Sequence, residues 1–390
     1  MPSVRPAAAR PTAEEAGPGL FAAIVAARDR GDVQAAIVAE LEYQAVYCDD
    51  IGSPLYGELL WRAAGDAREG GVTLEILRTR ADDPPFTALA LRLMAAVHRL
   101  VLTAGAPALA RHYASAGGDL GPDGAWDAFQ EVLATHTEEL QAGVTRPCQT
   151  NEPGRAAALL GGFLTVAAET GLPLRILEVG ASAGLNLRWD NFRYVSGDLA
   201  WGPADSAVVF DNVYEAAPPL QIPARVVERR GCDPNPQDPT TDETRLNLMS
   251  SAWPDQVERF RALEGALQVA RDVPATVDTA DGAAWVEQQL AEPRPGVATV
   301  VYHSIVMQYL DPEARARLHD VIVAAGTRAT AESPLARLSF EPGGRGRAHV
   351  DLFTWPGGER RLLATSGYHG RPVRWLSGDE TVADEGNAFY

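Results

Sequence analysis

A short segment near the middle of the chain constrains the fold more strongly than any other part. Residues 174–186 read LRILEVGASAGLN, an apolar run that includes Glu178 and is followed by glycines and other small residues. Apolar side chains on both faces are typical of a buried parallel strand. Gly180 and Gly184 permit positive φ angles and close approach of a ligand, which free amides at a following helix start would face. The segment predicts a strand, a tight turn and a helix start beside a binding site.

The acidic residue two positions before the first glycine indicates the kind of ligand. Sheets of this class bind ligands at the C-terminal ends of their strands, where a carboxylate can accept a hydrogen bond from an amino group. The pattern favours a nucleoside cofactor with an amino-acid tail, S-adenosylmethionine (SAM) above all. The alternative role for Glu178 is to cap the turn. The cofactor-binding residues expected from this segment are Glu178, Gly180, Ala181, Ser182, Gly184 and Asn186.

Other interpretations use the same residues. Residues 180–184 also match G-x-S-x-G, the nucleophile elbow of α/β-hydrolases, with Ser182 as the nucleophile. The histidines that follow it and could complete a triad are His303, His349 and His369. Glu178 has no role in a hydrolase, and no His-Gly-Gly-Gly segment precedes the motif to supply an oxyanion hole. The nicotinamide fingerprint G-x-G-x-x-G fails because Ser182 replaces its middle glycine, and a purely structural turn is a further alternative.

The composition limits the classes of partner. The 390 residues carry a formal net charge of -18 and contain no lysine, so binding to nucleic acid or to an anionic membrane is disfavoured. Cys48, Cys148 and Cys232 form no C-x-x-C pair, and neither disulfides nor a metal site are expected. The chain shows no signal peptide and no apolar run of about 18 residues. We expect a soluble, cytoplasmic protein that acts on a small molecule.

The apolar pattern divides the chain into three parts. Residues 1–18 are rich in Pro, Ala and Glu and are expected to form a disordered tail. Residues 19–148 show helical spacing of apolar residues, clearest over 89–100, which predicts an all-helical domain or cap. Residues 149–390 alternate strands with helices, which predicts an α/β domain with a doubly wound parallel sheet. A hairpin is expected to be inserted near residues 194–212.

Apolar runs and turn residues predict the elements of the α/β domain. A helix over residues 155–170 leads into the strand at 175–179. Further strands are expected at 224–228, 275–277, 297–303, 336–341, 348–354 and 360–365, and further helices at 283–290 and 312–325. The last two strands would form an antiparallel pair, joined by Pro356-Gly357-Gly358, that closes the sheet. This order matches class I SAM-dependent methyltransferases better than α/β-hydrolases.

Polar residues near strand and helix ends are further candidates for cofactor contact. Asp233, after the second strand, would hold the ribose hydroxyls, unless it is a plain turn residue. Asp281 would meet the adenine edge, with Asp278 as a competing choice and a helix N-cap as the structural alternative. Arg155 suits the carboxylate of the cofactor. Asn151 would face the same end of the ligand, or else cap the helix that follows.

Three residues are candidates for contact with the substrate. His303 ends the strongly apolar strand at 297–303, and histidine titrates near working pH. It would therefore take a proton from the methyl acceptor as a catalytic base, or else be a neutral histidine bonded to the backbone. Gln308 and, from the helical domain, Tyr56 are expected to line the substrate, with simple packing as the alternative for Tyr56.

Five motifs carry a resemblance to a known family. They are Ser53-Pro54-Leu55-Tyr56, Gln149-Thr150-Asn151-Glu152, residues 177–187, Gly231-Cys232-Asp233-Pro234 and Trp253-Pro254-Asp255. The chain resembles an uncharacterised bacterial family, domain of unknown function 2332, over most of its length after the tail. The resemblance implies a Rossmann-like class I methyltransferase sheet but no substrate. We expect a SAM-dependent methyltransferase for a small molecule, with a non-catalytic SAM-binding protein or a serine hydrolase as alternatives.

Overall fold

The computed structural model describes residues 10–84, 87–344 and 346–376. These residues form two units. Unit 1 contains the described residues up to Thr150 together with Leu246–Phe260. Unit 2 contains Asn151–Arg245 and the described residues from Arg261 onward. The boundary at Thr150 lies where the sequence pattern changes, whereas the inclusion of residues 246–260 in the helical unit has no counterpart in the predicted organisation.

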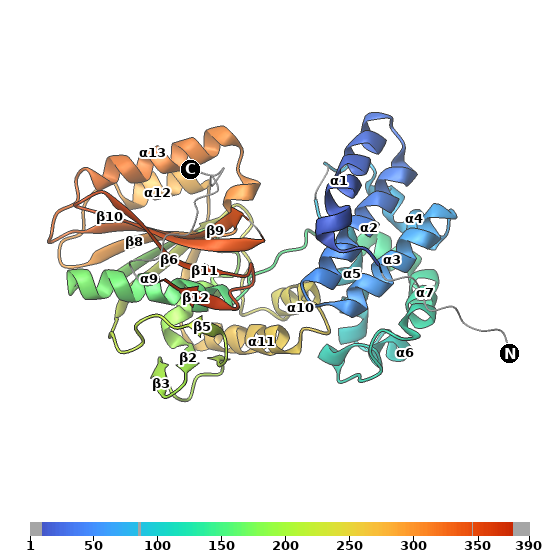
Figure 1. Cartoon of the computed structure of the whole chain (residues 1–390), viewed down its shortest axis with the longest axis horizontal. Coiled ribbons are helices and arrows are strands. Elements are labelled where there is room, and N and C mark those ends of the chain that lie inside the picture. Colours follow the sequence, from blue (N-terminus) through green and yellow to red (C-terminus); the bar gives the residue numbers. More distant parts are fainter. Residues whose placement is uncertain (1–9, 85–86, 345, 377–390) are drawn as a thin grey trace. The chain divides into compact units, whose positions relative to one another are not determined.

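Unit 1 is built from helices (Figure 1). They are α1 (Ala13–Asp29), α2 (Val33–Asp50), α3 (Pro54–Arg68), α4 (Val72–Leu77), η1 (Arg78–Arg80), α5 (Leu89–Leu102), α6 (Pro107–Ala110), η2 (Ala114–Ala116), α7 (Ala125–Thr135) and α8 (Thr137–Gly143). A capping box between Thr12 and Glu15 starts α1, because each side chain accepts from the backbone amide of the other. Residues 13–18, predicted as part of a disordered tail, are therefore helical. Residues 1–9 lie outside the described residues.

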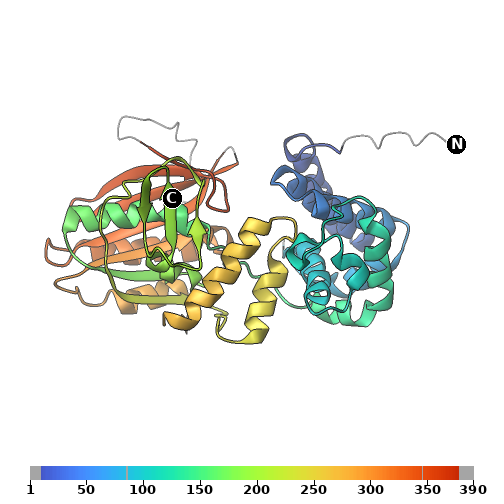
Figure 2. The ribbon, with the colours of Figure 1, turned by 90° about the horizontal axis from the view of Figure 1, so that it is seen from below.

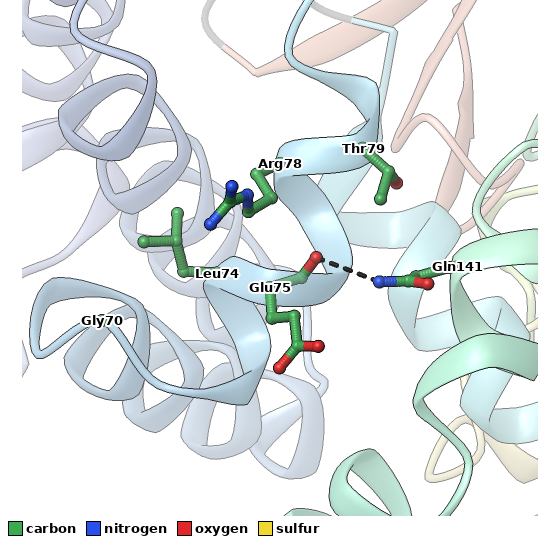
Figure 3. A pocket seen from close by; sticks show the side chains of 6 residues that line it. All are labelled: Gly70, Leu74, Glu75, Arg78, Thr79 and Gln141. Atoms are coloured by element: carbon green, nitrogen blue, oxygen red, sulfur yellow. Dashed lines mark hydrogen bonds between the residues drawn. The ribbon is translucent and has the colours of Figure 1, made fainter.

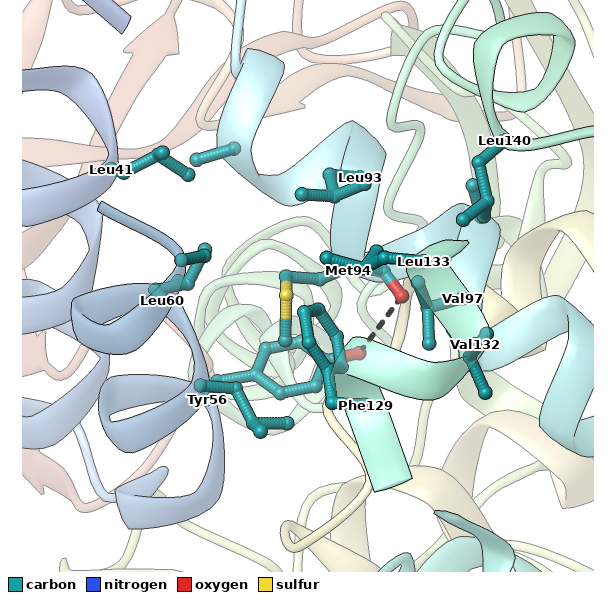
Figure 4. Packing of buried hydrophobic residues seen from close by; sticks show 14 of the residues in the cluster. Leu41, Tyr56, Leu60, Leu93, Met94, Val97, Phe129, Val132, Leu133 and Leu140 are labelled. Carbon is teal, nitrogen blue, oxygen red and sulfur yellow. Dashed lines mark hydrogen bonds between the residues drawn. The ribbon is translucent and has the colours of Figure 1, made fainter. Parts of the chain in front are cut away.

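An apolar core holds the helices of unit 1 together (Figure 4). Its buried side chains include Leu41, Leu60, Leu93, Val97, Phe129 and Leu133. Tyr56 is 1% exposed inside this core, where its hydroxyl donates to the Met94 carbonyl at 3.5 Å. Its ring also contacts the rings of Tyr113 and Trp253. These contacts match the packing alternative for Tyr56, and its contact with a substrate stays a prediction.

Residues 246–260 join unit 1 through two of the sequence motifs. Asp255 accepts hydrogen bonds from the Ser53 hydroxyl at 2.6 Å and from the Leu55 amide at 3.0 Å. Ser53 makes no side-chain capping bond to α3, so Asp255 supplies the acceptor that the helix N-terminus needs. Trp253 packs against Tyr56 nearby. The S-P-L-Y and W-P-D motifs therefore contact each other within unit 1 and hold residues 246–260 against the start of α3.

Unit 2 contains, within its described residues, a nine-stranded sheet in the order β5-β12-β11-β10-β9-β8-β1-β6-β7. The strands are β1 (Leu174–Val179), β5 (Tyr214–Ala216), β6 (Val226–Asp233), β7 (Thr276–Thr279), β8 (Ala298–Ser304), β9 (Leu335–Gly344), β10 (Arg347–Trp355), β11 (Glu359–Ser366) and β12 (Val373–Trp375). The block β7-β6-β1-β8-β9 is parallel, and β9 to β12 pair antiparallel. Numbered along the chain, the parallel block reads 3-2-1-4-5, a doubly wound order that reverses between β1 and β8. The predicted α/β class is confirmed.

Helices cover both faces of this sheet (Figure 1), and Figure 2 looks onto the face that α9 covers. On one face α9 packs against β8 to β11, and its Phe163 ring meets the Tyr302 ring of β8 edge-on. On the other face α12 and α13 share an apolar cluster with β1, β8 and β9. These helices span α9 (Arg155–Thr170), α12 (Gly282–Gln289) and α13 (Pro312–Gly326), while α10 (Asp242–Ser251) and α11 (Val257–Asp272) contain the two later boundaries between the units.

The connection from β1 to β6 departs from the predicted helix. It begins with the short 3-10 segment η3 (Leu185–Asn191), whose backbone is non-helical at Arg188. The Arg188 guanidinium donates to the carbonyls of Gly184 and Val273, both at 2.7 Å. These bonds hold the segment in place where its backbone departs from the helical conformation. A small sheet in the order β3-β2-β4 follows, and its antiparallel hairpin lies where the insert was expected. Its strands are β2 (Arg193–Ser196), β3 (Leu199–Trp201) and β4 (Val209–Phe210).

Two predictions about the sheet are corrected, one on the end of a strand and one on the edge of the sheet. The second parallel strand, β6, runs on to Asp233 instead of ending at residue 228, because Arg230 to Asp233 pair with β7. The predicted closing strand, β11, is not the edge of the sheet: β12 pairs with it and β5 pairs with β12. The partners β7 and β5 are distant along the chain from the strands they pair with, whereas β12 follows β11 directly.

Candidate ligand-binding site

The candidate site lies at the C-terminal ends of β1 and β8. Doubly wound sheets bind ligands in the crevice where the strand order reverses, and it reverses between these two strands. Glu178 of β1 lies beside Tyr302 of β8, and Val179 lies beside His303. Because side chains alternate along a strand, Glu178 and Tyr302 point towards α9, whereas Val179 and His303 point towards α12 and α13. The predicted residues are divided between the two faces of the sheet.

Glu178 is a buried carboxyl group with one hydrogen bond. It is 1% exposed, and the Tyr302 hydroxyl donates to its Oε2 at 3.0 Å. Burial raises its pKa to about 8, because the hydrogen bond from Tyr302 and the charges of Arg155 and Arg188 offset only part of the lost hydration. A ligand ammonium group would favour the ionised form. This combination makes Glu178 the best candidate in unit 2 for binding an amino group.

The turn after β1 is held by bonds within the protein. Gly180 and Gly184 have φ angles of 73° and 67°, as the sequence predicted for a tight turn. The amides of Gly180 and Ala181 both donate to the Cys232 carbonyl of β6, at 2.9 and 3.0 Å. Ser182 has a φ of 53°, an uncommon conformation for serine that often occurs at functional sites. The first two amides of this turn are therefore bonded to β6 and do not face a ligand.

Asp233 fixes the same turn from the end of β6. Its Oδ2 accepts the Ser182 amide at 2.9 Å, and its Oδ1 accepts the Asn235 amide at 2.8 Å. These bonds match the structural alternative, in which Asp233 is a turn residue. A carboxylate offers about four lone-pair sites, so each oxygen keeps one acceptor position. The predicted contact with a ribose stays a prediction.

The segment before α9 is bonded to the turn after β1. Asn151 Oδ1 accepts the Leu185 amide at 2.9 Å, and Asn186 Nδ2 donates to the Glu152 carbonyl at 3.2 Å. The N-cap position of α9 is Gly154, so Asn151 does not cap this helix. The alternative in which Asn151 caps α9 is therefore wrong, because its side chain is used by the first amide of η3. That bond also removes the free helix amide expected for a ligand.

Two side-chain atoms of the turn lack partners. Ser182 Oγ and Asn186 Oδ1 are buried, and no group among the described residues forms a hydrogen bond with either. Buried polar atoms are bonded in the great majority of cases, in proteins as a whole. A ligand group or a water molecule at these two atoms would complete the site beside Glu178.

His303 forms a buried pair with a residue that the sequence analysis did not select. Its Nδ1 lies 2.7 Å from Glu341 Oε1, and the two side chains are 0% and 1% exposed. Glu341 Oε1 also accepts the Val306 amide at 3.0 Å. The alternative in which His303 bonds a backbone group is replaced by this carboxylate. Glu341 is the last residue of the strand predicted at 336–341. An acidic residue at the end of an apolar strand was the signal that could have identified it.

A serine hydrolase requires a hydrogen bond between its nucleophile and its histidine. Ser182 Oγ and His303 Nε2 are both without a partner among the described residues, so they do not bond each other. His349 and His369 were the other candidates from the sequence, and no bond from Ser182 Oγ to either is formed. The left-handed turn resembles a nucleophile elbow, but no triad is assembled on it.

The remaining predicted residues lie in separate places. Arg155 Nη1 donates to the Ser304 carbonyl at 2.9 Å, which places this guanidinium at the end of β8. Gln308 is exposed on η4 (Met307–Tyr309), beyond the end of β8. Asp281 accepts the Ala284 amide and caps α12, the structural alternative, which explains it without a ligand. Asp278 bonds Arg230 and the Trp285 indole, both at 2.7 Å.

Two pockets are lined by residues other than those of this site. One of about 470 Å³ is in unit 1, where the Gln141 amide donates to the Glu75 carbonyl at 3.3 Å (Figure 3). The other includes Arg175, Thr299 and Leu335, which lie at the N-terminal ends of β1, β8 and β9. That end of the sheet is opposite the strand ends at which doubly wound sheets bind ligands.

Comparison with known proteins identifies the family. The profile of the bacterial family DUF2332, described as "Uncharacterized protein conserved in bacteria", matches residues 38–375. The chain belongs to this family. No curated protein matches the chain, and no solved structure matches it. Within the described ranges, no helix has both the length and the apolar character needed to cross a bilayer.

Proposed function

We propose that this member of DUF2332 is a SAM-dependent methyltransferase that acts on a small molecule. The observation that carries the proposal is Glu178, a buried carboxyl group at the C-terminal end of β1 where the strand order reverses. The amino group of SAM is a cation that this carboxylate would bind, and no lysine in the chain competes for it. In this proposal the sheet is of the class I methyltransferase type.

The turn fits the remainder of the cofactor in part. Ser182 Oγ and Asn186 Oδ1 are buried and have no partner within the described ranges. At the amino-acid end of the cofactor, Asn186 Oδ1 would accept a hydrogen bond, and Ser182 Oγ would accept or donate one. Arg155 would pair with the carboxylate from the end of β8. Asp233 would use its remaining lone pairs for the ribose hydroxyls while it still holds the turn. When bound, SAM supplies an electrophilic methyl group, and the protein supplies position and enclosure.

Equilibrium dialysis with methyl-tritiated SAM tests the binding. We expect the wild-type protein to retain SAM and Glu178→Gln to lose at least tenfold in affinity, because a hydrogen bond to a charged group contributes about 1.5–3 kcal/mol. Asp351→Asn is the matched control: Asp351 is also a buried carboxyl group with a raised pKa, but it lies on β10 and pairs with Arg360. This variant should bind SAM like the wild type.

The same labelled cofactor tests the activity. The protein is incubated with the low-molecular-mass fraction of a bacterial extract, and the transfer of tritium to small molecules is measured. Label in a product that depends on Glu178 would support a methyltransferase. Retention of SAM without transfer to any fraction would favour the non-catalytic alternative, and no retention by folded protein would refute the cofactor assignment.

A further inference from the structure

We infer that Glu341 positions His303 so that its Nε2 atom takes the proton of the methyl acceptor. The inference rests on the proposed function, which supplies the methyl group, and it adds a positioning residue and a class of acceptor. The acceptor would be one whose attacking atom carries a proton, such as a hydroxyl compound. Four observations about the His303–Glu341 pair support this.

The first observation is the bonding of the carboxylate. Glu341 Oε1 is 2.7 Å from His303 Nδ1 and 3.0 Å from the Val306 nitrogen. An oxygen that accepts an amide hydrogen is oriented as an acceptor towards the ring nitrogen as well. The short bond to the ring therefore requires a hydrogen on His303 Nδ1. A neutral imidazole carries one hydrogen, so Nε2 is left with its lone pair.

The second observation is burial. His303 is 0% exposed and Glu341 is 1% exposed, so water does not compete for their bond. The bond to Glu341 restricts the imidazole to one orientation. A carboxylate that holds the other ring nitrogen is how catalytic histidines in unrelated enzymes are oriented and how the imidazolium is stabilised.

The third observation is the unused atom. His303 Nε2 is buried, and no group among the described residues forms a hydrogen bond with it. Glu341 Oε2 is likewise buried without a partner in this part of the chain. A structural histidine would be expected to satisfy both ring nitrogens. The second nitrogen is thus available to a bound group.

The fourth observation connects the pair to the glycine turn. Val306, whose amide Glu341 binds, packs against Gly180, where an added Cβ would lie 2.4 Å from Val306 Cγ2. Between His303 and Val306, Ile305 has a φ of 54°, which is a genuine outlier for a β-branched residue. The chain is therefore turned sharply at the end of β8, and the turned segment abuts the loop proposed to bind SAM.

The chemistry follows from this arrangement. A hydroxyl oxygen attacks the methyl carbon as its own O–H bond breaks, and His303 Nε2 receives the proton. The new O–C bond forms, and the S–C bond breaks with its electron pair remaining on sulfur, which yields a methyl ether and S-adenosylhomocysteine. Glu341 then compensates the positive charge of the imidazolium. No other reactant is needed.

Nuclear magnetic resonance of the full chain labelled with 15N-histidine tests the inference directly. Long-range 1H–15N correlations distinguish a ring nitrogen that bears hydrogen from one that does not, and loss of a signal in His303→Gln assigns His303. At neutral pH we expect hydrogen on Nδ1 and none on Nε2. Glu341→Gln, which keeps an acceptor oxygen, should retain this tautomer. Glu341→Met, which removes the acceptor, should shift His303 towards the form with hydrogen on Nε2.

Addition of S-adenosylhomocysteine separates this inference from the proposed function. We expect it to change the Nε2 resonance of His303 in the wild type. Calorimetric binding with no change at His303 would overturn the inference alone, and the absence of binding would refute the proposed function. Hydrogen on Nε2 in the wild type would overturn the inference irrespective of binding. If Glu341→Met does not fold, the wild-type and Glu341→Gln spectra are sufficient.

Discussion

The buried carboxyl group of Glu178 gives the stability of unit 2 a defined dependence on pH. Its pKa is about 8 in the folded protein, against an ordinary value of 4.5. The folded state therefore binds the proton more tightly than the unfolded state, and stability falls as pH rises from about 4.5 to 8. At about 1.4 kcal/mol per pKa unit, this loss amounts to roughly 3–4 kcal/mol between pH 5 and pH 8. That is a large part of the total stability of a typical domain, about 5–15 kcal/mol.

The variant Glu178→Gln removes this dependence. Glutamine has nearly the same shape and can still accept the Tyr302 hydroxyl, but it does not ionise. We expect the unfolding free energy of the variant, relative to the wild type, to rise by roughly 3–4 kcal/mol from pH 5 to pH 8. Urea unfolding followed by circular dichroism and tryptophan fluorescence at several pH values measures this difference, in which the other titrating groups cancel.

An exposed carboxylate provides the control. Glu287 on α12 is 68% exposed and lies 4.0 Å from Arg317. The curves for Glu287→Gln and the wild type should run parallel over the whole pH range, because exposed ion pairs contribute little. If the Glu178→Gln curve were also parallel to that of the wild type, Glu178 would not be the buried, ionisable group on which the site is built.

Three further predictions concern the steric space at Gly180 and the hydrogen bonds that Asp233 and Asp255 accept. Gly180→Ala should lower the melting temperature more than Gly171→Ala, because both glycines have positive φ but only Gly180 has a neighbour, Val306, within 4 Å of an added Cβ. Asp233→Ala should destabilise unit 2 by about 2–4 kcal/mol in urea unfolding, since two backbone amides lose a charged acceptor; an unchanged midpoint would contradict its role in the turn. Asp255→Ala should cost about 1–2 kcal/mol as a lost helix cap in the same assay, and SAM retention in dialysis should be unchanged.

Local signals predicted part of the fold well. The helix over residues 155–170 has the observed bounds of α9, and the predicted first strand differs from β1 by one residue. Both segments are strongly apolar and end at glycine. The end of β6 was missed because Arg229 and Arg230 are not typical of a buried strand, and pairing with β1 and β7 extends the strand to Asp233. The chain after β1 was predicted as a helix start, but long-range bonds from Arg188 hold it as a kinked 3-10 segment.

The candidate site was predicted less completely than the fold. Glu178 and the positive φ angles of Gly180 and Gly184 follow from local sequence. The partner of His303 does not, because Glu341 lies 38 residues later and meets it only through the register of β8 and β9. Asn151 likewise has a sequence typical of a helix cap, yet it bonds an amide 34 residues away. Local sequence patterns do not predict the partner of a side chain when strand pairing or packing brings that partner from a distant part of the chain.

The central claim is that Glu178 binds the amino group of the cofactor, and a comparison of two ligands tests it most directly. S-adenosylhomocysteine carries the amino-acid tail, whereas 5′-methylthioadenosine lacks it. Calorimetric titration should show that the wild type binds S-adenosylhomocysteine more tightly than 5′-methylthioadenosine, and that Glu178→Gln reduces this preference at least about tenfold. A preference for the tail that is as large in Glu178→Gln as in the wild type, or no binding of either ligand to the folded wild type, would contradict the account.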